Sequence, residues 1–221
     1  MKLLIQALTK YLAGLGMVGL LLFLPAGTLH YPNGWLFCGL LFLPMLILGV
    51  ILYLKAPALL EKRLQSKESQ QEQKQVIGLS LLMFLSGFIL AGLDFRFGWS
   101  AVPGWLVALS SLLLLISYGL YGEVMRENAW LSRTVEIQNG QQVVDTGLYG
   151  LIRHPMYAVT TVLFLSIPLV LGSWISFTVF LFYPALMVKR ILSEERLLKE
   201  NLPGYDAYMK KVKYRMIPFI W

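Results

Sequence analysis

The chain has 221 residues, of which 57% are apolar and only 14% are charged, and its mean hydropathy is +0.65. This composition excludes a water-soluble domain, which would have to expose too much apolar surface, and predicts an integral membrane protein. The formal net charge of +7 would by itself fit nucleic-acid binding, so the positions of the basic residues decide what the charge means.

Four apolar runs in the first part of the chain have the length of membrane-spanning helices. A helix needs about 20 residues to cross a hydrocarbon core about 30 Å thick. Lys2 and Lys10 lie around the start of the first run, as in a signal peptide, but no small-x-small cleavage site closes it, which favours a retained span. The four runs cover residues 11–29, 34–54, 76–93 and 101–122.

Two features inside these runs have a structural explanation. The stretch "GLGMVG" from Gly14 to Gly19 fits a dinucleotide-binding pattern, but no strand precedes it. Small residues at this spacing within a membrane helix instead predict close helix packing. Cys38 is the only cysteine and lies in the second run, so we expect a packing residue, no intrachain disulfide and no metal site.

The basic residues follow the predicted topology. The polar segment 55–75 is predicted to be a helical connector, and every lysine and arginine except Arg96 falls on its side of the membrane. The positive-inside rule then predicts a cell-membrane protein with both termini in the cytoplasm. We therefore expect no nucleic-acid partner, and contact between the basic face and membrane lipids.

The segment 123–155 is predicted to lie over the cytoplasmic mouth of the helices. Its stretch "TVEIQNGQQVVDTG" places β-prone residues on both sides of Asn139 and Gly140. This dipeptide favours a two-residue hairpin turn, so the sequence predicts a small β-hairpin.

The last part of the chain is predicted to form a helical hairpin followed by amphipathic helices. The apolar region 156–188 is interrupted by Pro168, Gly172 and Ser173, which predicts two short helices that turn back on each other. An amphipathic helix follows until Pro203 and Gly204 end it, and residues 205–215 form a second, interfacial one. The expected fold is an all-α polytopic membrane protein with about six transmembrane segments, in which region 1–122 holds four helices and region 123–221 binds the cofactor.

The first constellation of polar residues is "RHPMY". Pro155 fits the first turn of a helix and disfavours a helical conformation at His154, which then lies at the cap. Together with Arg153, the free amides of this turn favour binding of a carboxylate or phosphate. The alternative is a helix start anchored among lipid headgroups.

The second constellation is "KRILSEERLL". Arg190 and Glu194 lie at i and i+4 on one helix face, and Glu195 follows. The predicted hairpin brings this cluster beside Arg153 and His154, in a polar cavity, because a carboxylate facing lipid is costly. The alternative is an exposed ion pair. Acidic groups and tyrosine faces beside a positive helix start suit a zwitterion with a fixed cation, such as S-adenosylmethionine.

The C-terminal third of the chain, residues 145–221, resembles a known family. "GLYGLIRHPMY", "RILSEERLL" and "YDAYMKKVKYRMIP" are similar to motifs of the isoprenylcysteine carboxyl methyltransferases and phospholipid methyltransferases of membranes. The resemblance implies that S-adenosyl-L-methionine binds at one set of residues, and that another set closes the pocket or orients the methyl acceptor. The first set is Tyr149, Arg153, His154, Pro155 and Tyr157. We expect Tyr205 to bind the cofactor with them. The second set is Arg190, Glu194 and Glu195.

These inferences predict an S-adenosylmethionine-dependent methyltransferase that acts on a lipophilic acceptor from the bilayer. The first expectation is carboxyl O-methylation of an isoprenylcysteine-like substrate, with N-methylation of a phospholipid or S-methylation of a small thiol as alternatives. Arg190 would orient the acceptor, and His154 or Glu194 would act as base for an amine or thiol. We expect Arg153→Ala and Glu194→Gln to abolish cofactor binding in a folded protein.

Two other classes of function remain open. Membrane sterol reductases are similar in their C-terminal helices and use NADPH, so a reductase is one alternative. The other is a noncatalytic adaptor that uses the basic face for contact with lipids or a partner.

Overall fold

The computed structural model describes residues 2–64, 71–132 and 137–221, and over these residues it is all-helical, with 77% helix and no strand. This confirms the all-α class. In chain order the elements are α1 (Lys2–Ala26), α2 (Pro32–Lys55), α3 (Pro57–Leu64), α4 (Gln71–Phe97), α5 (Gly104–Glu127), the 3-10 helix η1 (Gly147–Gly150), α6 (Pro155–Val170), α7 (Trp174–Phe180), α8 (Phe182–Asn201) and α9 (Tyr205–Lys211).

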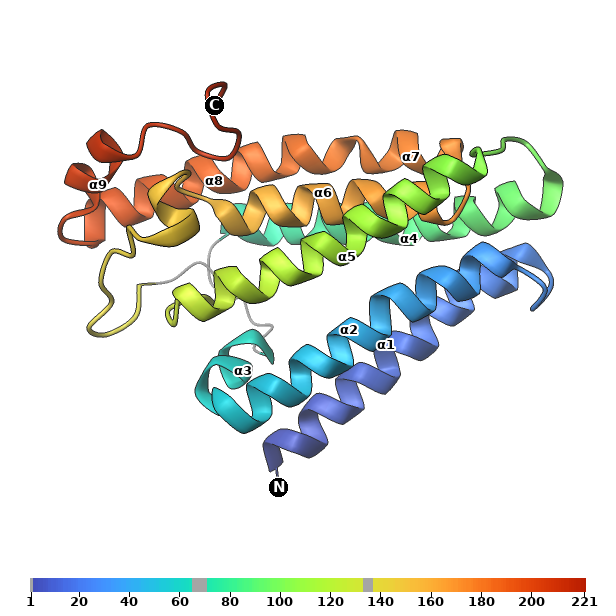
Figure 1. The fold of residues 1–221 in the computed structure, drawn as a ribbon, viewed down its shortest axis with the longest axis horizontal. Coiled ribbons are helices and arrows are strands. Elements are labelled where there is room, and N and C mark those ends of the chain that lie inside the picture. The colour runs from blue at the N-terminus through green and yellow to red at the C-terminus, as the bar shows by residue number, and fades with distance from the viewer. Residues whose placement is uncertain (1, 65–70, 133–136) are drawn as a thin grey trace.

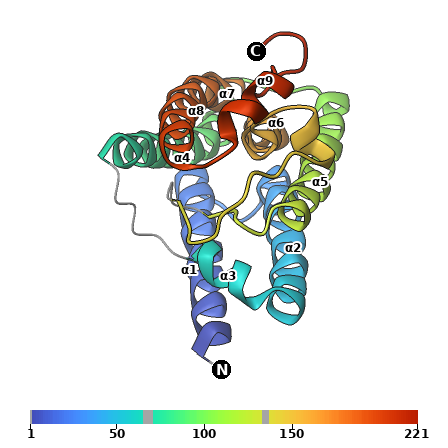
Figure 2. The ribbon, with the colours of Figure 1, turned by 90° about the vertical axis from the view of Figure 1, so that its left-hand side faces the viewer.

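The long helices form a bundle whose two ends differ. Figure 1 shows α5, α6 and the α7–α8 pair running side by side with α4 behind them, while α1 and α2 diverge from α5 toward the end that holds α3 and α9. The end-on view in Figure 2 confirms that α3 and the segment after α5 lie across this same end. We call it the basic end, because the lysines and arginines other than Arg96 belong to the segments predicted to gather there.

Five helical stretches of the described residues are long and apolar enough to cross a membrane: α1, α2, Gln73–Phe97, α5 and Trp174–Asn201. The sixth apolar helix, α6, has only 16 residues, or about 24 Å of helix at ~1.5 Å per residue. The described residues therefore give five candidate spans and a shorter apolar helix, where the sequence predicted about six spans.

The predicted helical hairpin forms, but its second arm is longer than expected. Pro168 lies inside α6 and does not end it. The reversal follows at Gly172, which has a φ of +82°, a conformation that favours glycine. The Ser173 hydroxyl then caps α7 by accepting from the Ser176 amide. After a break at Leu181, α8 continues the arm to Asn201. Pro184 falls in the first turn of α8, where a helix tolerates proline, and the pattern after it is amphipathic.

A buried carboxylate fixes this reversal at the end of the bundle opposite the basic end. Asp94, near the end of α4, is 1% exposed. It accepts hydrogen bonds from the Ser100 amide at 2.7 Å and from the Ser173 hydroxyl. The Tyr31 hydroxyl donates to the Leu171 carbonyl at 2.6 Å. These bonds tie the α6–α7 turn to α2 and α4, so the hairpin is held in place at its tip.

The prediction of a β-hairpin is wrong for the part of this segment that the structure describes. The turn itself forms, since Gly140 has a φ of +75° and the Gln141 amide donates to the Gln138 carbonyl at 3.0 Å. Residues 137–146 nevertheless contain no strand, and residues 134–136 of the predicted hairpin lie outside the described residues. Isolated two-stranded hairpins are marginal, and here the Gln138 side chain bonds the Trp130 carbonyl instead.

The glycine-rich stretch of α1 packs less closely than predicted. A Cβ added at Gly14 would lie 3.9 Å from Phe42, and one added at Gly16 or Gly19 would meet nothing within 4 Å. The close approach occurs at Gly92 of α4, where a Cβ would lie 2.5 Å from the Leu22 carbonyl oxygen. Packing of α1 against α4 therefore depends on the glycine of the partner helix. Cys38 is buried in the apolar core, as predicted.

Candidate functional site

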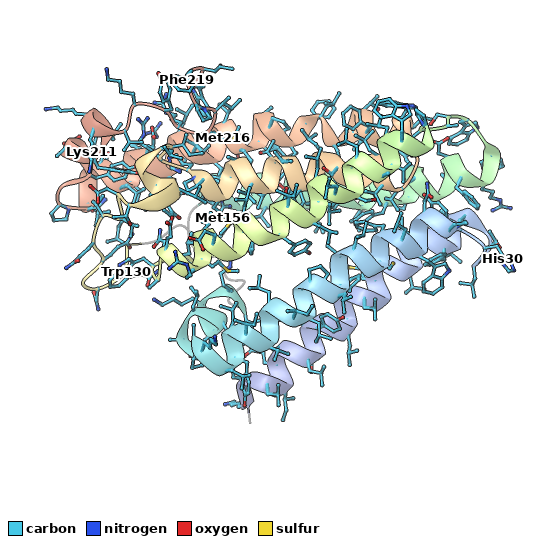
Figure 3. All side chains as sticks on the ribbon, in the orientation of Figure 1. His30, Trp130, Met156, Lys211, Met216 and Phe219 are labelled. Carbon is cyan, nitrogen blue, oxygen red and sulfur yellow. The ribbon has the colours of Figure 1, made fainter. Side chains whose placement is uncertain are left out.

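A cavity of about 710 Å³ opens at the basic end of the bundle, a size typical of small-molecule sites. Seven of the predicted site residues line it, whereas Pro155 and Glu195 do not. Trp130 and Met156, which also line it, lie near Lys211 and far from His30 (Figure 3). The seven residues are Tyr149, Arg153, His154, Tyr157, Arg190, Glu194 and Tyr205.

The start of α6 follows the prediction from sequence. Pro155 occupies the first turn, and His154 precedes it in a non-helical conformation with φ −125° and ψ 61°. The amides of Arg153 and His154 donate to the carbonyls of Tyr214 and Arg215, at 2.9 and 2.8 Å. The C-terminal segment 212–221, which we call the C-terminal strap, therefore lies directly against the "RHP" turn.

A buried charge cluster holds the C-terminal strap in place. Arg153 donates from Nε to Glu195 Oε1 at 2.7 Å and from Nη1 to the carbonyls of Val212 and Lys213. Arg215 Nε donates to Glu195 Oε2 at 2.8 Å, and His154 Nε2 lies 3.2 Å from Glu195 Oε1. Arg153 and Glu195 are 6% and 5% exposed. The guanidinium of Arg153 is thus committed largely to the protein, and Glu195 lies behind the cavity wall.

A second cluster faces the cavity directly. The Tyr157 hydroxyl donates to Glu194 Oε2, and Arg190 Nε donates to the Tyr157 oxygen at 2.9 Å. The rings of His154 and Tyr157 are stacked, with centroids 5.7 Å apart. Tyr157 therefore connects Arg190 to Glu194, and the hairpin brings both predicted constellations into one cavity.

Tyrosines of the loop and of α9 close the basic end of the cavity. The Tyr208 hydroxyl donates to the Tyr149 carbonyl at 2.7 Å. The Tyr205 hydroxyl is buried and has no hydrogen-bond partner among the described residues. Burial, and next the negative charge of Glu195, raise the pKa of Tyr205 far above its usual value, so it remains a neutral hydroxyl. Burial likewise raises the pKa of Tyr149 and Tyr208.

Glu127, at the end of α5, positions the loop that carries Tyr149. Its Oε2 accepts from the Leu148 amide at 2.9 Å. Gly147 has a φ of +52°, and a Cβ there would lie 1.4 Å from Glu127 Oε1. The role of Glu127 is not predictable from sequence, because its partner is 21 residues away and no local pattern marks the pair.

The cavity continues from this polar end into the bundle. Its deeper wall is apolar and aromatic and comes from α2, α4, α5 and α6, with Leu41, Met45, Phe84, Tyr118 and Phe164 among its residues. Arg63 of α3 also lines the cavity. The sequence analysis missed this wall as well, because apolar residues facing a cavity look the same in sequence as those facing lipid.

Comparison with known families gives a match for the part of the chain that carries most residues of the two charge clusters. Residues 101–203 match the family model described as phospholipid methyltransferase. This region is similar to the phospholipid methyltransferase family. The match runs from the start of α5 to the end of α8 and includes Arg153, His154, Tyr157, Arg190 and Glu194. It confirms the resemblance found in the sequence and implies a membrane methyltransferase.

Individual relatives cover only part of the chain. It is 30% identical over 91 residues to the Delta(14)-sterol reductase TM7SF2 of Mus musculus, covering 40% of this chain and 22% of the reductase. It is 27% identical over 104 residues to the nickel-cobalt-cadmium resistance protein NccN of Alcaligenes xylosoxydans xylosoxydans, covering 44% of this chain and 47% of that protein. The chain thus spans about a fifth and about half of these relatives, whereas the phospholipid methyltransferase match includes Arg153, Arg190 and Glu194 of the cavity.

Proposed function

We propose that this membrane protein transfers a methyl group from S-adenosylmethionine to a lipophilic acceptor. The observation that carries the proposal is the shared cavity: acidic, basic and phenolic groups meet at one end of it, and an apolar wall continues from them into the bundle. A polar cofactor from the aqueous side and an acceptor from the bilayer would meet at this junction. The family match favours methyl transfer over other reactions at such a junction.

The polar end of the cavity fits this cofactor chemically. S-adenosylmethionine carries an ammonium, a carboxylate, hydroxyls and a sulfonium, which need acceptors, donors and electron-rich groups. Glu194 and the rings of Tyr157 and Tyr149 would contact the cationic groups. The Tyr205 hydroxyl lacks a partner among the residues that the structure describes, and leaving such a group unpaired costs about 1–3 kcal/mol. A bound ligand that bonds Tyr205 would recover this cost.

The residues of the chain would act by positioning and by excluding water. When bound, S-adenosylmethionine supplies a methyl group already activated on its sulfonium. Alignment of two reactants in a site cleared of water removes much of the remaining barrier. Arg190, held at Tyr157 by a 2.9 Å hydrogen bond, would orient the acceptor. We expect Glu195 to act as a positioning residue that fixes Arg153 and His154.

The acceptor determines whether a base is needed. A carboxylate is nucleophilic as it stands, so carboxyl O-methylation of an isoprenylcysteine-like substrate needs only orientation. An amine or a thiol would have to lose a proton, and Glu194 or His154 would take it. Glu194 is the better placed of the two, because it is half-buried at the cavity, whereas His154 Nε2 lies against Glu195.

The experiment that tests the proposal uses membranes that contain the full chain. They are incubated with S-adenosylmethionine labelled in its methyl group, and the labelled products are separated into prenylated cysteine esters, phospholipids and small thioethers. We expect label in a lipophilic product, and none with Glu194→Gln. The proposal would be contradicted if no product contained more label than the same product from membranes without the protein.

One observation supports a second candidate function. The local identity with the mouse Delta(14)-sterol reductase keeps an NADPH-dependent reductase as the alternative. Binding of S-adenosylhomocysteine and of NADPH to the purified chain separates the two: the methyltransferase proposal requires the first ligand, and the reductase alternative requires the second.

A further inference from the structure

One wall of the cavity is formed by helices that precede the family match. The matched region, residues 101–203, holds Arg153, Glu195, Arg190 and Glu194 of the two charge clusters. The opposing wall comes from α2, α3 and α4, which precede that region. This wall is almost wholly apolar, with Leu41, Met45 and Phe84 as examples. Under the proposed function, the segments that face the cofactor residues across the cavity are those that contact the acceptor.

Arg63 is the one charged side chain that this wall contributes within the described ranges. It lies in the last turn of α3 and is half-buried. Its Nη1 donates to the Ser132 carbonyl at 3.2 Å, its Nη2 donates to the Tyr121 hydroxyl, and its Cζ lies 5.5 Å from the centroid of the Tyr121 ring. A phenol and a carbonyl hold the guanidinium at the cavity, but neither neutralises it.

The other arginines of the cavity differ in this respect. Arg153 forms a buried ion pair with Glu195 at 2.7 Å. Arg190 bonds Tyr157, whose hydroxyl bonds Glu194. A guanidinium is suited to bidentate binding of carboxylate and phosphate oxygens. A half-buried guanidinium beside an apolar wall therefore matches an amphiphile whose head is anionic.

We propose that Arg63 recognises an anionic head group of the methyl acceptor, whose apolar body lies along the wall formed by α2 and α4. This inference rests on the proposed function only in identifying the bound amphiphile as the methyl acceptor. Binding of an anionic amphiphile at Arg63 does not depend on it. Two sources supply the same chemistry: a carboxylate that is itself methylated, and a phosphate next to the nucleophile. In either case, the positive charge of Arg63 excludes an acceptor whose head group is purely cationic.

The test measures head-group preference in the full chain, without cofactor. The protein is reconstituted in nanodiscs of zwitterionic lipid with a fluorescent fatty acid bound, and four dodecyl compounds compete: dodecanoate, dodecyl phosphate, dodecanol and dodecyltrimethylammonium. We expect both anions to displace the probe about tenfold more effectively than dodecanol, as a charge-assisted hydrogen bond would give. The order of dodecanoate and dodecyl phosphate then indicates which of the two sources applies.

Variants of adjacent residues give a matched comparison. Arg63→Gln should abolish the preference for anions over dodecanol, and Arg63→Lys should retain part of it. Lys62→Gln serves as the control, because Lys62 contacts Gln138 and the Trp130 ring and does not line the cavity. Equal thermal unfolding of the variants shows that each is folded.

Two results would overturn the inference. One is an undiminished preference for anions in Arg63→Gln, and the other is strongest displacement by dodecyltrimethylammonium in the unaltered protein. S-adenosylhomocysteine binding is measured separately and should be equal in Arg63→Gln and the unaltered protein. Absence of S-adenosylhomocysteine binding in the unaltered protein would contradict the proposed function. The competition between the dodecyl compounds alone decides the role of Arg63.

Discussion

At the scale of single residues, the two neighbouring acids of α8 have different surroundings. Glu194 faces the cavity and accepts from Tyr157, whereas Glu195 is buried among Arg153, His154 and Arg215. The sequence predicted that both would act at the cofactor, because adjacent acids look alike in a motif. It does not reveal which of them is buried, since that depends on the C-terminal strap, about 20 residues further along the chain.

This difference predicts that Arg153→Ala mainly lowers stability, whereas Glu194→Gln mainly lowers cofactor binding. Removal of one partner from a buried ion pair costs about 3–5 kcal/mol, so Arg153→Ala should lower the free energy of unfolding by about that amount. The expectation from sequence, that this variant stays folded and loses only cofactor binding, is revised accordingly. Glu194→Gln should lose cofactor binding with little change in stability. Thermal unfolding in detergent, with and without S-adenosylhomocysteine, measures both effects, and equal stability of the two variants would contradict the assignment.

Tyr205→Phe should separate ligand binding from stability. The hydroxyl bonds none of the described residues, so its removal should leave the free energy of unfolding unchanged or slightly higher. If the cofactor bonds this hydroxyl, affinity for S-adenosylhomocysteine should fall about fivefold, corresponding to about 1 kcal/mol. Tyr208→Phe is the contrasting variant, because it loses the 2.7 Å bond to the Tyr149 carbonyl and should be less stable. A destabilised Tyr205→Phe with unchanged affinity would show that its hydroxyl serves the fold.

The raised tyrosine pKa values predict how stability depends on pH. Tyr149, Tyr205 and Tyr208 have pKa values above the ordinary value of 10.0. Below pH 10 both the folded and the unfolded chain keep these protons, so their contribution to stability is fully present. Above it the unfolded chain loses protons first, and stability should fall as pH rises. Tyr205→Phe should make this alkaline decline shallower in unfolding measurements between pH 8 and 11, and an equally steep decline would count against burial of that hydroxyl.

At the scale of elements, sequence predicted what depends on local pattern. The apolar runs became helices, Pro155 began α6, and the reversal fell at Gly172 and Ser173. Two predictions failed: the β-hairpin around Gly140, because such a hairpin is marginal without a further strand, and close packing at the glycines of α1, because packing depends on the partner helix. The close contact between α1 and α4 depends on Gly92, a position that no pattern in α4 distinguishes.

The loop that leads to α6 depends on one glycine. Gly147→Ala should destabilise the protein by about 1–3 kcal/mol, because φ is +52° and the added Cβ would collide with the Glu127 carboxylate. Gly204→Ala is the matched control: its φ is +85°, but its added Cβ meets no atom within 4 Å, so only backbone strain applies. Chemical denaturation of both variants measures the difference. Equal losses would show that contact with Glu127 does not matter.

At the scale of the whole molecule, the charge distribution predicts the orientation in the membrane. We expect the basic end, with α3 and α9, to lie in the cytoplasm. In a Cys38→Ala background, a membrane-impermeant thiol reagent should label His30→Cys in intact cells. It should label Lys213→Cys only after permeabilisation. The reverse pattern would place the cavity mouth on the other side and would contradict delivery of the cofactor from the cytoplasm.

The cavity is also a property of the whole molecule. The matched family region contributes most of the polar side chains and the part of the apolar wall that comes from α5 and α6, whereas α2, α3 and α4, outside that region, form the facing wall. Sequence predicted the first part through its motifs. It did not predict the second, because the contribution of Arg63 appears only when α3 is placed across the basic end (Figure 2).

The most direct test of the account is the affinity of the purified full chain for S-adenosylhomocysteine, measured beside NADPH and repeated with Glu194→Gln. We predict saturable binding of S-adenosylhomocysteine, no comparable binding of NADPH, and loss of binding in a folded Glu194→Gln variant. Binding of NADPH alone, or unchanged S-adenosylhomocysteine affinity in the variant, would contradict a cofactor site between α6 and α8.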